Sequence, residues 1–128
     1  MHPVVHFEIT ANDMQRASDF YHKAFGWHIT FMPEYKYTVV TTSPVNPTTR
    51  MHEKPGAING GIMHKKDQLQ HPIITISTNN MDESIQAVKD AGGTIVGEPY
   101  DVGTMGIAAY FKDTEGNIMG LWQDKSMK

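Results

Sequence analysis

The sequence predicts an α+β fold in which two βαβββ repeats form a curled mixed sheet around a cup, with the helices packed outside. The first observation behind this is an internal repeat: residues 10–14 (TANDM) match residues 77–81 (STNNM) at an offset of 67, which is 77 − 10. The second is a change of period within each copy, from the alternation of a strand to the spacing of a helix. One such unit cannot cover both faces of its own sheet, so the two sheets should curl together or pair with another chain.

Each copy is expected to open with a strand. Residues 4–10 alternate as a strand does, and residues 73–78 are β-branched and apolar. Asn12 and Asn79 then stand where a helix N-cap belongs. Each copy also holds a pair with capping-box spacing, Asn12 with Gln15 and Asn80 with Glu83.

Apolar residues at helical spacing follow each expected cap, and glycines follow the helices: Gly26 in the first copy and Gly92–Gly93 in the second. The expected inward-facing positions are Met14, Ala17, Tyr21, Ala24, Phe25, Met81, Ile85, Val88 and Ala91. Met119 is also placed in the core, and Trp27 is read as packing. The methionines are therefore explained by core filling.

Three further strands complete each copy. They are expected at residues 27–31, 37–42, 58–63, 94–96, 107–111 and 118–123. Residues 43–56 carry three prolines and a polar run, so they are expected to form a long irregular connection. Residues 64–70 should join the copies, and residues 113–117 should form a tight hairpin turn.

The chain length and composition are typical of one globular domain. The 128 residues should form a single domain, 1–128, with modules at about 1–64 and 70–128. The net charge of −3 and the scattered basic residues argue against nucleic acid as a partner. We see no secretory leader and no apolar run long enough for a membrane span, so a cytoplasmic protein is expected. Because there is no cysteine, only His, Asp and Glu could serve as strong metal ligands.

Three segments resemble the glyoxalase/bleomycin resistance/extradiol dioxygenase (vicinal oxygen chelate, VOC) superfamily. Residues 6–27 (HFEITANDMQRASDFYHKAFGW) resemble its opening, residues 58–65 (INGGIMHK) the end of its first module, and residues 111–123 (FKDTEGNIMGLWQ) its closing hairpin and strand. The chain looks most similar to small bacterial proteins described as lactoylglutathione-lyase-related. This resemblance covers nearly the whole chain and implies a homodimer, because superfamily members commonly complete their pockets across two chains.

The resemblance also implies a metal site whose ligands this chain largely lacks. In the metal-dependent members, four ligands from four strands hold a divalent ion that chelates two substrate oxygens. The first corresponds to His6, but its counterpart in the second module is Ile73, and the last-strand carboxylate corresponds to Gly120. The fourth should lie in residues 56–63, where only Asn59 is a weak polar candidate. One ligand of four is too few for a zinc or nickel site, so no cofactor is favoured.

Residues two apart on a strand face the same way, so His6 and Glu8 should point together into the cup. They could act as a general acid or base, since a carboxylate orients a histidine and raises its pKa. The alternative is a buried histidine that merely keeps a hydrogen-bond partner. A rearranged site for Ni, Zn, Mn or Fe would need His71 or His64 to converge on His6; the set considered is His6, Glu8 and His71.

Other strand residues are candidates for lining the substrate pocket. Trp122 should share a face with Gly120, which leaves room for a ligand that stacks on the indole. The alternative is that Trp122 fills the volume of the missing ion. The polar candidates for the pocket lining are Asn59, Thr75, Ser77 and Tyr110.

Three functions remain open at the level of sequence. The first is a small-molecule-binding protein of the superfamily that lacks the usual metal site and either sequesters its ligand or catalyses a modest isomerase or lyase step. The second is a metal-dependent lyase or isomerase with a rearranged site. The third is a non-catalytic interaction module, in which Trp122 and Met119 would fill a collapsed pocket.

Overall fold

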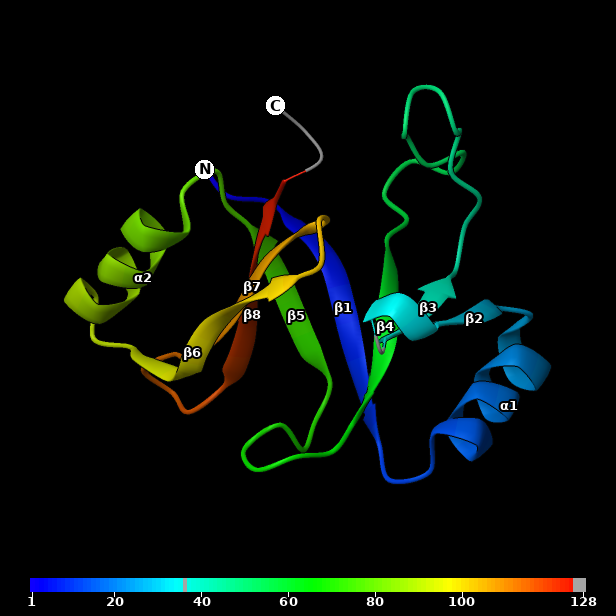
Figure 1. The fold of residues 1–128 in the computed structure, drawn as a ribbon, viewed down its shortest axis with the longest axis horizontal. Helices are drawn as coiled ribbons and strands as arrows, with labels where there is room; N and C mark the ends of the chain where they lie inside the picture. Colours follow the sequence, from blue (N-terminus) through cyan, green and yellow to red (C-terminus); the bar gives the residue numbers. More distant parts are fainter. Residues whose placement is uncertain (36, 126–128) are drawn as a thin grey trace. The chain divides into compact units, whose positions relative to one another are not determined.

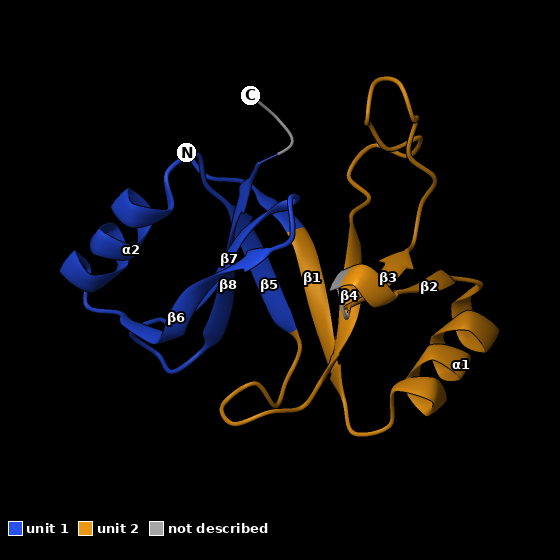
Figure 2. Ribbon diagram, in the orientation of Figure 1, with its two compact units in different colours: residues 1–5, 73–128 blue, residues 6–72 orange. Residues whose placement is uncertain are grey.

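The computed structural model describes residues 1–35 and 37–125. The chain divides into two compact units, coloured separately in Figure 2. Unit 1 comprises residues 1–5 and 73–128, and unit 2 comprises residues 6–72. Unit 1 therefore takes the beginning of the chain together with the second repeat, and each unit is described by itself.

Unit 2 contains one βαβββ repeat (Figure 1). Its strands lie in the order β2-β3-β4-β1, with β1 parallel to β4 and the other pairs antiparallel. A short 3-10 turn, which the sequence did not predict, separates β2 from β3. The elements are β1 (Val4–Ala11, its first two residues in unit 1), α1 (Met14–Phe25), β2 (His28–Met32), η1 (Pro33–Tyr35), β3 (Tyr37–Thr41) and β4 (Asn59–His64).

Unit 1 repeats the same arrangement. Its strands lie in the order β5-β8-β7-β6, so the first strand of the repeat again lies beside the last. The β5–β8 pair is parallel and the other two pairs are antiparallel. The predicted βαβββ repeats and the α+β class are thus confirmed. The elements are β5 (Ile73–Ser77), α2 (Met81–Asp90), β6 (Thr94–Val102), β7 (Gly106–Lys112) and β8 (Ile118–Asp124).

Each unit has its own apolar core between its sheet and its helix. In unit 2 the core is formed by Ala11, Val40 and Ile62, with Phe7, Ile9, Met14, Ala17, Trp27 and Ile29 packed against them. In unit 1 it is formed by Met81, Ala109, Phe111 and Leu121, with Ile76, Ile85, Val88, Ile95, Ile107 and Met119 packed against them. The core positions predicted for Met14, Met81, Met119 and Trp27 are confirmed.

The N-caps predicted at Asn12 and Asn79 each lie one residue before the observed cap, whereas the predicted pairing of Asn80 with Glu83 is present. The α1 cap is Asp13, whose Oδ1 accepts from Arg16 N at 2.9 Å, and not Asn12. The α2 cap is Asn80, whose Oδ1 accepts from Glu83 N at 3.1 Å, and not Asn79. Each helix begins one residue later than a cap at Asn12 or Asn79 implies. The caps still differ by 80 − 13 = 67 residues, which keeps the offset of the repeat.

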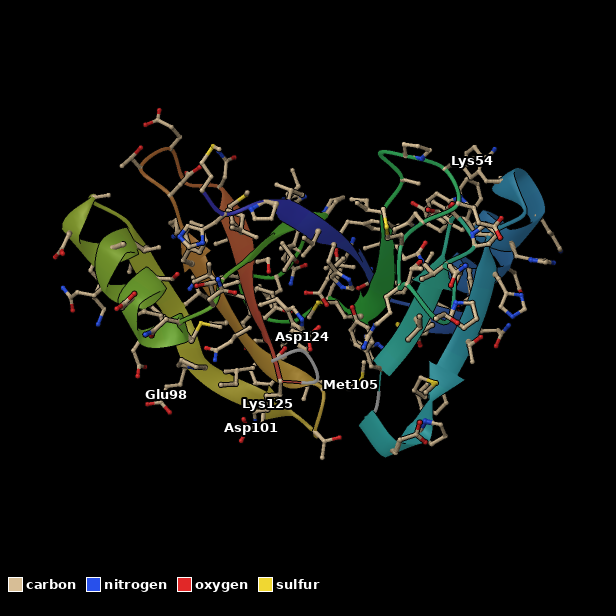
Figure 3. The ribbon with its side chains drawn as sticks, turned by 90° about the horizontal axis from the view of Figure 1, so that it is seen from above. Lys54, Glu98, Asp101, Met105, Asp124 and Lys125 are labelled. Carbon is tan, nitrogen blue, oxygen red and sulfur yellow. The ribbon has the colours of Figure 1, made fainter. Side chains whose placement is uncertain are left out.

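The other boundaries differ from prediction mainly at β6. This strand continues to Val102 through a register shift between Val96 and Tyr100 against β7. Near its end, Asp101 forms an ion pair of 2.7 Å with Lys125, the residue after β8 (Figure 3). Gly97 lies at φ 73°, within this register shift.

The predicted turns and connections are present. Gly26 ends α1 in the left-handed conformation, at φ 72°. Residues 43–56 are irregular apart from a bridge between Val45 and His52. In the 113–117 hairpin, Asp113 accepts from the backbone of Glu115 and Asn117, and Gly116 has φ 87°.

No helix among residues 1–35 and 37–125 is both long enough and apolar enough to cross a membrane. The predicted curl around a cup, the single domain and the module limits are not tested and stay predictions.

Candidate functional site

His6 and Glu8 lie on the face of the unit 2 sheet opposite α1. The intervening residues of β1, Phe7 and Ile9, pack in the core beneath the helix. Because side chains alternate along a strand, His6 and Glu8 point to the other face. His6 is half-buried and Glu8 is buried, with 7% of its surface exposed.

The hydroxyl of Tyr37 connects these two side chains. It donates to Glu8 Oε2 at 2.9 Å and lies 2.8 Å from His6 Nε2. A tyrosine hydroxyl has one proton. Since that proton goes to Glu8, the phenolic oxygen accepts from His6, and Nε2 of the imidazole carries a hydrogen. The result is a directed chain from His6 through Tyr37 to Glu8.

Gly61 makes room for this arrangement. Gly61 is on β4, where it lies opposite Glu8 of β1 and opposite Val39 of β3. Its strand therefore runs between β1, which carries His6 and Glu8, and β3, which carries Tyr37. A Cβ at Gly61 would collide with the ring and hydroxyl of Tyr37. Glycine here permits the close approach of an aromatic ring to the backbone.

Burial and Glu8 act in opposite directions on the pKa of His6. Burial lowers this pKa because it disfavours the charged imidazolium, and the nearby Glu8 carboxylate raises it by a smaller amount. The net pKa is below the ordinary value of 6.5. His6 is therefore neutral at neutral pH, with a hydrogen on Nε2 and a lone pair on Nδ1, the form that can accept a proton.

Asn59, a predicted pocket residue, uses its amide to hold the chain where β3 ends. Its Oδ1 accepts from Thr42 N at 2.8 Å and from Ser43 N at 3.2 Å. Its Nδ2 donates to Ser43 O at 3.3 Å. The side chain of Asn59 thus anchors the start of the 43–56 connection, although its backbone lies opposite His6.

The other predicted pocket residues gather on one face of the unit 1 sheet. Thr75, Gly120 and Tyr110 form one row across β5, β8 and β7, and Trp122 lies in the next row. Met119 and Leu121 pack toward α2, so Gly120 and Trp122 face away from it. The structure thus brings Thr75, Tyr110, Gly120 and Trp122 together.

Thr75 has an unusual environment within this group. It is 5% exposed, and its Oγ1 has no hydrogen-bond partner in the described part of the chain. A Cβ on Gly120 would lie 2.8 Å from that oxygen. The Tyr110 hydroxyl lies 3.4 Å from the Tyr100 hydroxyl. A buried hydroxyl without a partner costs free energy, and a ligand could offset that cost.

The structure bears on two alternatives from the sequence, that Trp122 fills the volume of the missing ion and that Trp122 and Met119 fill a collapsed pocket. Met119 packs against the core beneath α2, so it does not fill the face that carries Trp122. The ring of Trp122 covers Gly106, where a Cβ would strike the indole. Trp122 therefore packs against the sheet itself, at the start of β7, where Gly106 lies.

The residues present do not fit the metal centre of the metal-dependent superfamily members. Within residues 1–35 and 37–125, no three His, Cys, Asp or Glu side chains come close enough to hold an ion, so His71 does not complete a set with His6 and Glu8. His6 Nε2 is bonded to Tyr37, Ile73 is 1% exposed and apolar, and Gly120 has no side chain.

Tyr37 is the component of the site that the sequence did not reveal. The sequence predicts its strand but not its contact with His6 and Glu8, because the register of β3 against β4 cannot be read from one sequence. The adjacent glycines Gly60 and Gly61 were the available indication. Two glycines within a strand often mark a place where another group approaches the backbone.

A comparison with protein families matches residues 4–121 to the model described as "Glyoxalase/Bleomycin resistance protein/Dioxygenase superfamily". Among curated proteins, the chain is 26% identical over 127 residues to a protein named lactoylglutathione lyase from Escherichia coli O157:H7. That alignment covers 95% of this chain and 93% of the relative. A protein of the same name from Shigella flexneri matches to the same extent.

Solved structures share the fold at low identity. Methylmalonyl-CoA epimerase from Mycobacterium tuberculosis superposes with a TM-score of 0.61 at 14% identity, covering 94% of this chain and 87% of that one. A superfamily member from Vibrio splendidus 12B01 gives a TM-score of 0.61 at 12% identity, covering 97% of this chain and 100% of that one. At these identities the likeness establishes a glyoxalase-like fold alone.

Proposed function

Because the chain belongs to the glyoxalase/bleomycin resistance protein/dioxygenase superfamily, we propose that it binds a small molecule without the metal centre of the metal-dependent members. The observation that carries the proposal is the His6–Tyr37–Glu8 chain on the sheet face opposite α1. A sheet face that served only for packing would be apolar, because burying a polar group costs free energy unless it forms hydrogen bonds. This face instead keeps polar side chains in a hydrogen-bonded network.

Unit 1 adds support through Thr75, whose buried hydroxyl lies close over Gly120 and has no hydrogen-bond partner among the described residues. A carbonyl or hydroxyl of the ligand would give this oxygen a partner, and Trp122 and Tyr110 would offer aromatic surface. The predicted curl of the two modules around a shared cup, the homodimer and the cytoplasmic location belong to this proposal.

Metal analysis is the first test. Protein without an affinity tag is equilibrated with nickel, zinc, manganese or iron, dialysed, and measured for bound metal beside a His6→Ala variant. We expect far less than one equivalent for both proteins. Near-stoichiometric metal that disappears in His6→Ala would overturn the proposal.

Ligand binding is the second test. A thermal-shift screen of neutral carbonyl and aromatic compounds is run on the wild type and on Thr75→Val, which keeps the shape but removes the hydroxyl. Compounds that stabilise the wild type should stabilise Thr75→Val less. A Thr114→Val variant is the control, because Thr114 is exposed in the 113–117 hairpin and lies outside the row formed by Thr75, Gly120 and Tyr110.

A lyase or isomerase is the second candidate, favoured by the 26% identity to proteins named lactoylglutathione lyase. In that case His6 would accept or return a proton at a substrate carbon, with Tyr37 and Glu8 orienting the imidazole. Turnover of lactoylglutathione by the metal-free protein, lost in His6→Gln, would establish it. Absence of turnover with metal present or absent would leave the binding role.

A further inference from the structure

A cleft lies on the side of the unit 2 sheet that carries α1, between α1 and β2. This α1–β2 cleft has a volume of 520 Å³ and is lined by α1 residues between Met14 and His22, by His28, Ile29 and Phe31 of β2, and by Thr38 of β3. Its size lies within the range of small-molecule sites. It is separate from the His6–Tyr37–Glu8 chain, which faces away from α1.

The cleft exists because α1 packs on only part of its sheet. In α1, which is described in full, no residue is buried, whereas α2 of unit 1 buries Met81. Met14 and Ala17 pack on the unit 2 core. The helix positions that face β2 are polar instead, and β2 is the edge strand of the unit. Phe31 is consequently left 61% exposed in the wall of the cleft.

Among the polar side chains that line the cleft, His22 and Asp19 offer hydrogen-bond acceptors, beside amide and hydroxyl groups that can also donate. His22 Nδ1 lies 2.9 Å from Trp27 O, and a carbonyl can only accept, so Nδ1 carries the hydrogen. In this tautomer Nε2 is the ring nitrogen that can accept a hydrogen bond. Asp19 contributes a carboxylate, one oxygen of which accepts from Gln15 Nε2 at 2.9 Å.

Asp19 is the carboxylate of the cleft lining, which also includes His22 and His28. No lysine or arginine is among the described residues of its lining, so Asp19 gives it one negative charge. Arg16 and Lys23 line a different, shallower hollow on the outer side of α1, which also includes Asp19. A cation placed on the β2 side meets the carboxylate together with the exposed ring of Phe31.

From this geometry we propose that the α1–β2 cleft binds an organic ammonium ion with an aromatic or alkyl body. The ammonium group donates to Asp19 and to His22 Nε2, and it lies against the face of Phe31. The body of the ligand packs on Met14 and Ile29. This site is independent of the proposed function, because it uses none of the residues of the other face.

The test compares two probes of the same shape by two-dimensional amide NMR: 2-phenylethylammonium and the neutral 2-phenylethanol. We expect saturable shift changes concentrated in residues 14–22 and 28–31. The ammonium ion should bind more tightly than the alcohol by about fivefold or more, as a partly exposed ion pair and cation–π contact allow.

Two variants assign the binding to its groups. Asp19→Asn and Phe31→Leu should each weaken ammonium binding by about fivefold, since Leu keeps the apolar surface but not the ring. Asp82→Asn, on exposed α2 surface in unit 1, is the matched control and should leave the affinity unchanged. Circular dichroism confirms that each variant is folded.

Three results would overturn the proposal. One is the absence of saturable shifts in α1 and β2, and another is equal affinity for the alcohol and the ammonium ion. The third is unchanged affinity in both Asp19→Asn and Phe31→Leu, which would place any binding at another surface.

Discussion

At the scale of single residues, the Tyr37 hydroxyl is central to the candidate site, because it forms hydrogen bonds with both His6 and Glu8. Tyr37→Phe removes it and keeps the ring that packs above Gly61. The buried Glu8 carboxylate then loses a donor, so we expect a loss of about 1–3 kcal/mol in the free energy of unfolding. Denaturant titration measures it.

Tyr21→Phe is the control for this prediction. Tyr21 stacks on Trp27 with ring centroids 5.0 Å apart, and no hydrogen bond to its hydroxyl occurs within the described residues. Its removal should change the free energy of unfolding little. If the two variants lost equal stability, the Tyr37 hydroxyl would have no special role.

The lowered pKa of His6 predicts how stability depends on pH. The folded protein holds a proton on His6 less readily than the unfolded chain does. Between the folded pKa and 6.5, the unfolded state therefore binds more protons, and the free energy of unfolding falls as the pH falls through this window. Above 6.5 this contribution is constant.

His6→Gln should remove that part of the pH dependence, while its side-chain amide can still form a hydrogen bond with the Tyr37 hydroxyl. The measurement is denaturant unfolding of both proteins from pH about 5 to 8, with the His6 resonances titrated by NMR. A His6 pKa above 6.5 in the folded protein, or identical slopes for the two proteins, would contradict the prediction.

At the scale of elements, the residues that cap the two helices can be tested by substitution. Asp13→Ala and Asn80→Ala should each cost about 1 kcal/mol, because each removes the acceptor for a backbone N–H of the first turn. Asn12→Ala and Asn79→Ala are matched neighbours and should cost much less. Thermal or denaturant unfolding of the four variants decides between the two assignments.

The elements themselves were largely predictable because their periods and glycines are local properties of the chain. Gly26 ends α1 as expected, and the 67-residue offset survives in the caps. The alignment of the repeats placed the caps one residue too early, at Asn12 and Asn79, because Asn12 and Asp13 are equally good cap residues. The choice between Asn12 and Asp13 depends on where β1 ends. The spacing of Asn80 to Glu83 gave the correct cap of α2.

The candidate site was predicted less completely, for a reason that also belongs to this scale. The alternation of β1 places His6 and Glu8 on one face, which required no knowledge of other strands. The contact with Tyr37 depends on the register of β3 against β4, and the orientation of Asn59 depends on the backbone of residues 42–43. Such pairings between strands are not encoded in local periodicity.

At the scale of the whole molecule, the question is whether the two units unfold as one. Each has its own core, which would allow separate transitions. Strand β1 argues the other way, because Val4–Val5 belong to unit 1 and residues 6–11 to unit 2. If unit 1 unfolds, β1 loses its first two residues, so unit 2 cannot keep this strand whole. We therefore expect one cooperative transition, as is usual at this size.

The two tryptophans report on the units separately, Trp27 in unit 2 and Trp122 in unit 1. Single-tryptophan variants Trp27→Phe and Trp122→Phe are unfolded in denaturant, and each fluorescence transition is compared with circular dichroism of the same variant. In each variant the two transitions should coincide. Ile62→Ala in the unit 2 core should then shift the Trp122 transition as well, through a loss of about 2–5 kcal/mol. A Trp122 transition that ignores Ile62→Ala would instead show that each repeat is a folding unit of its own.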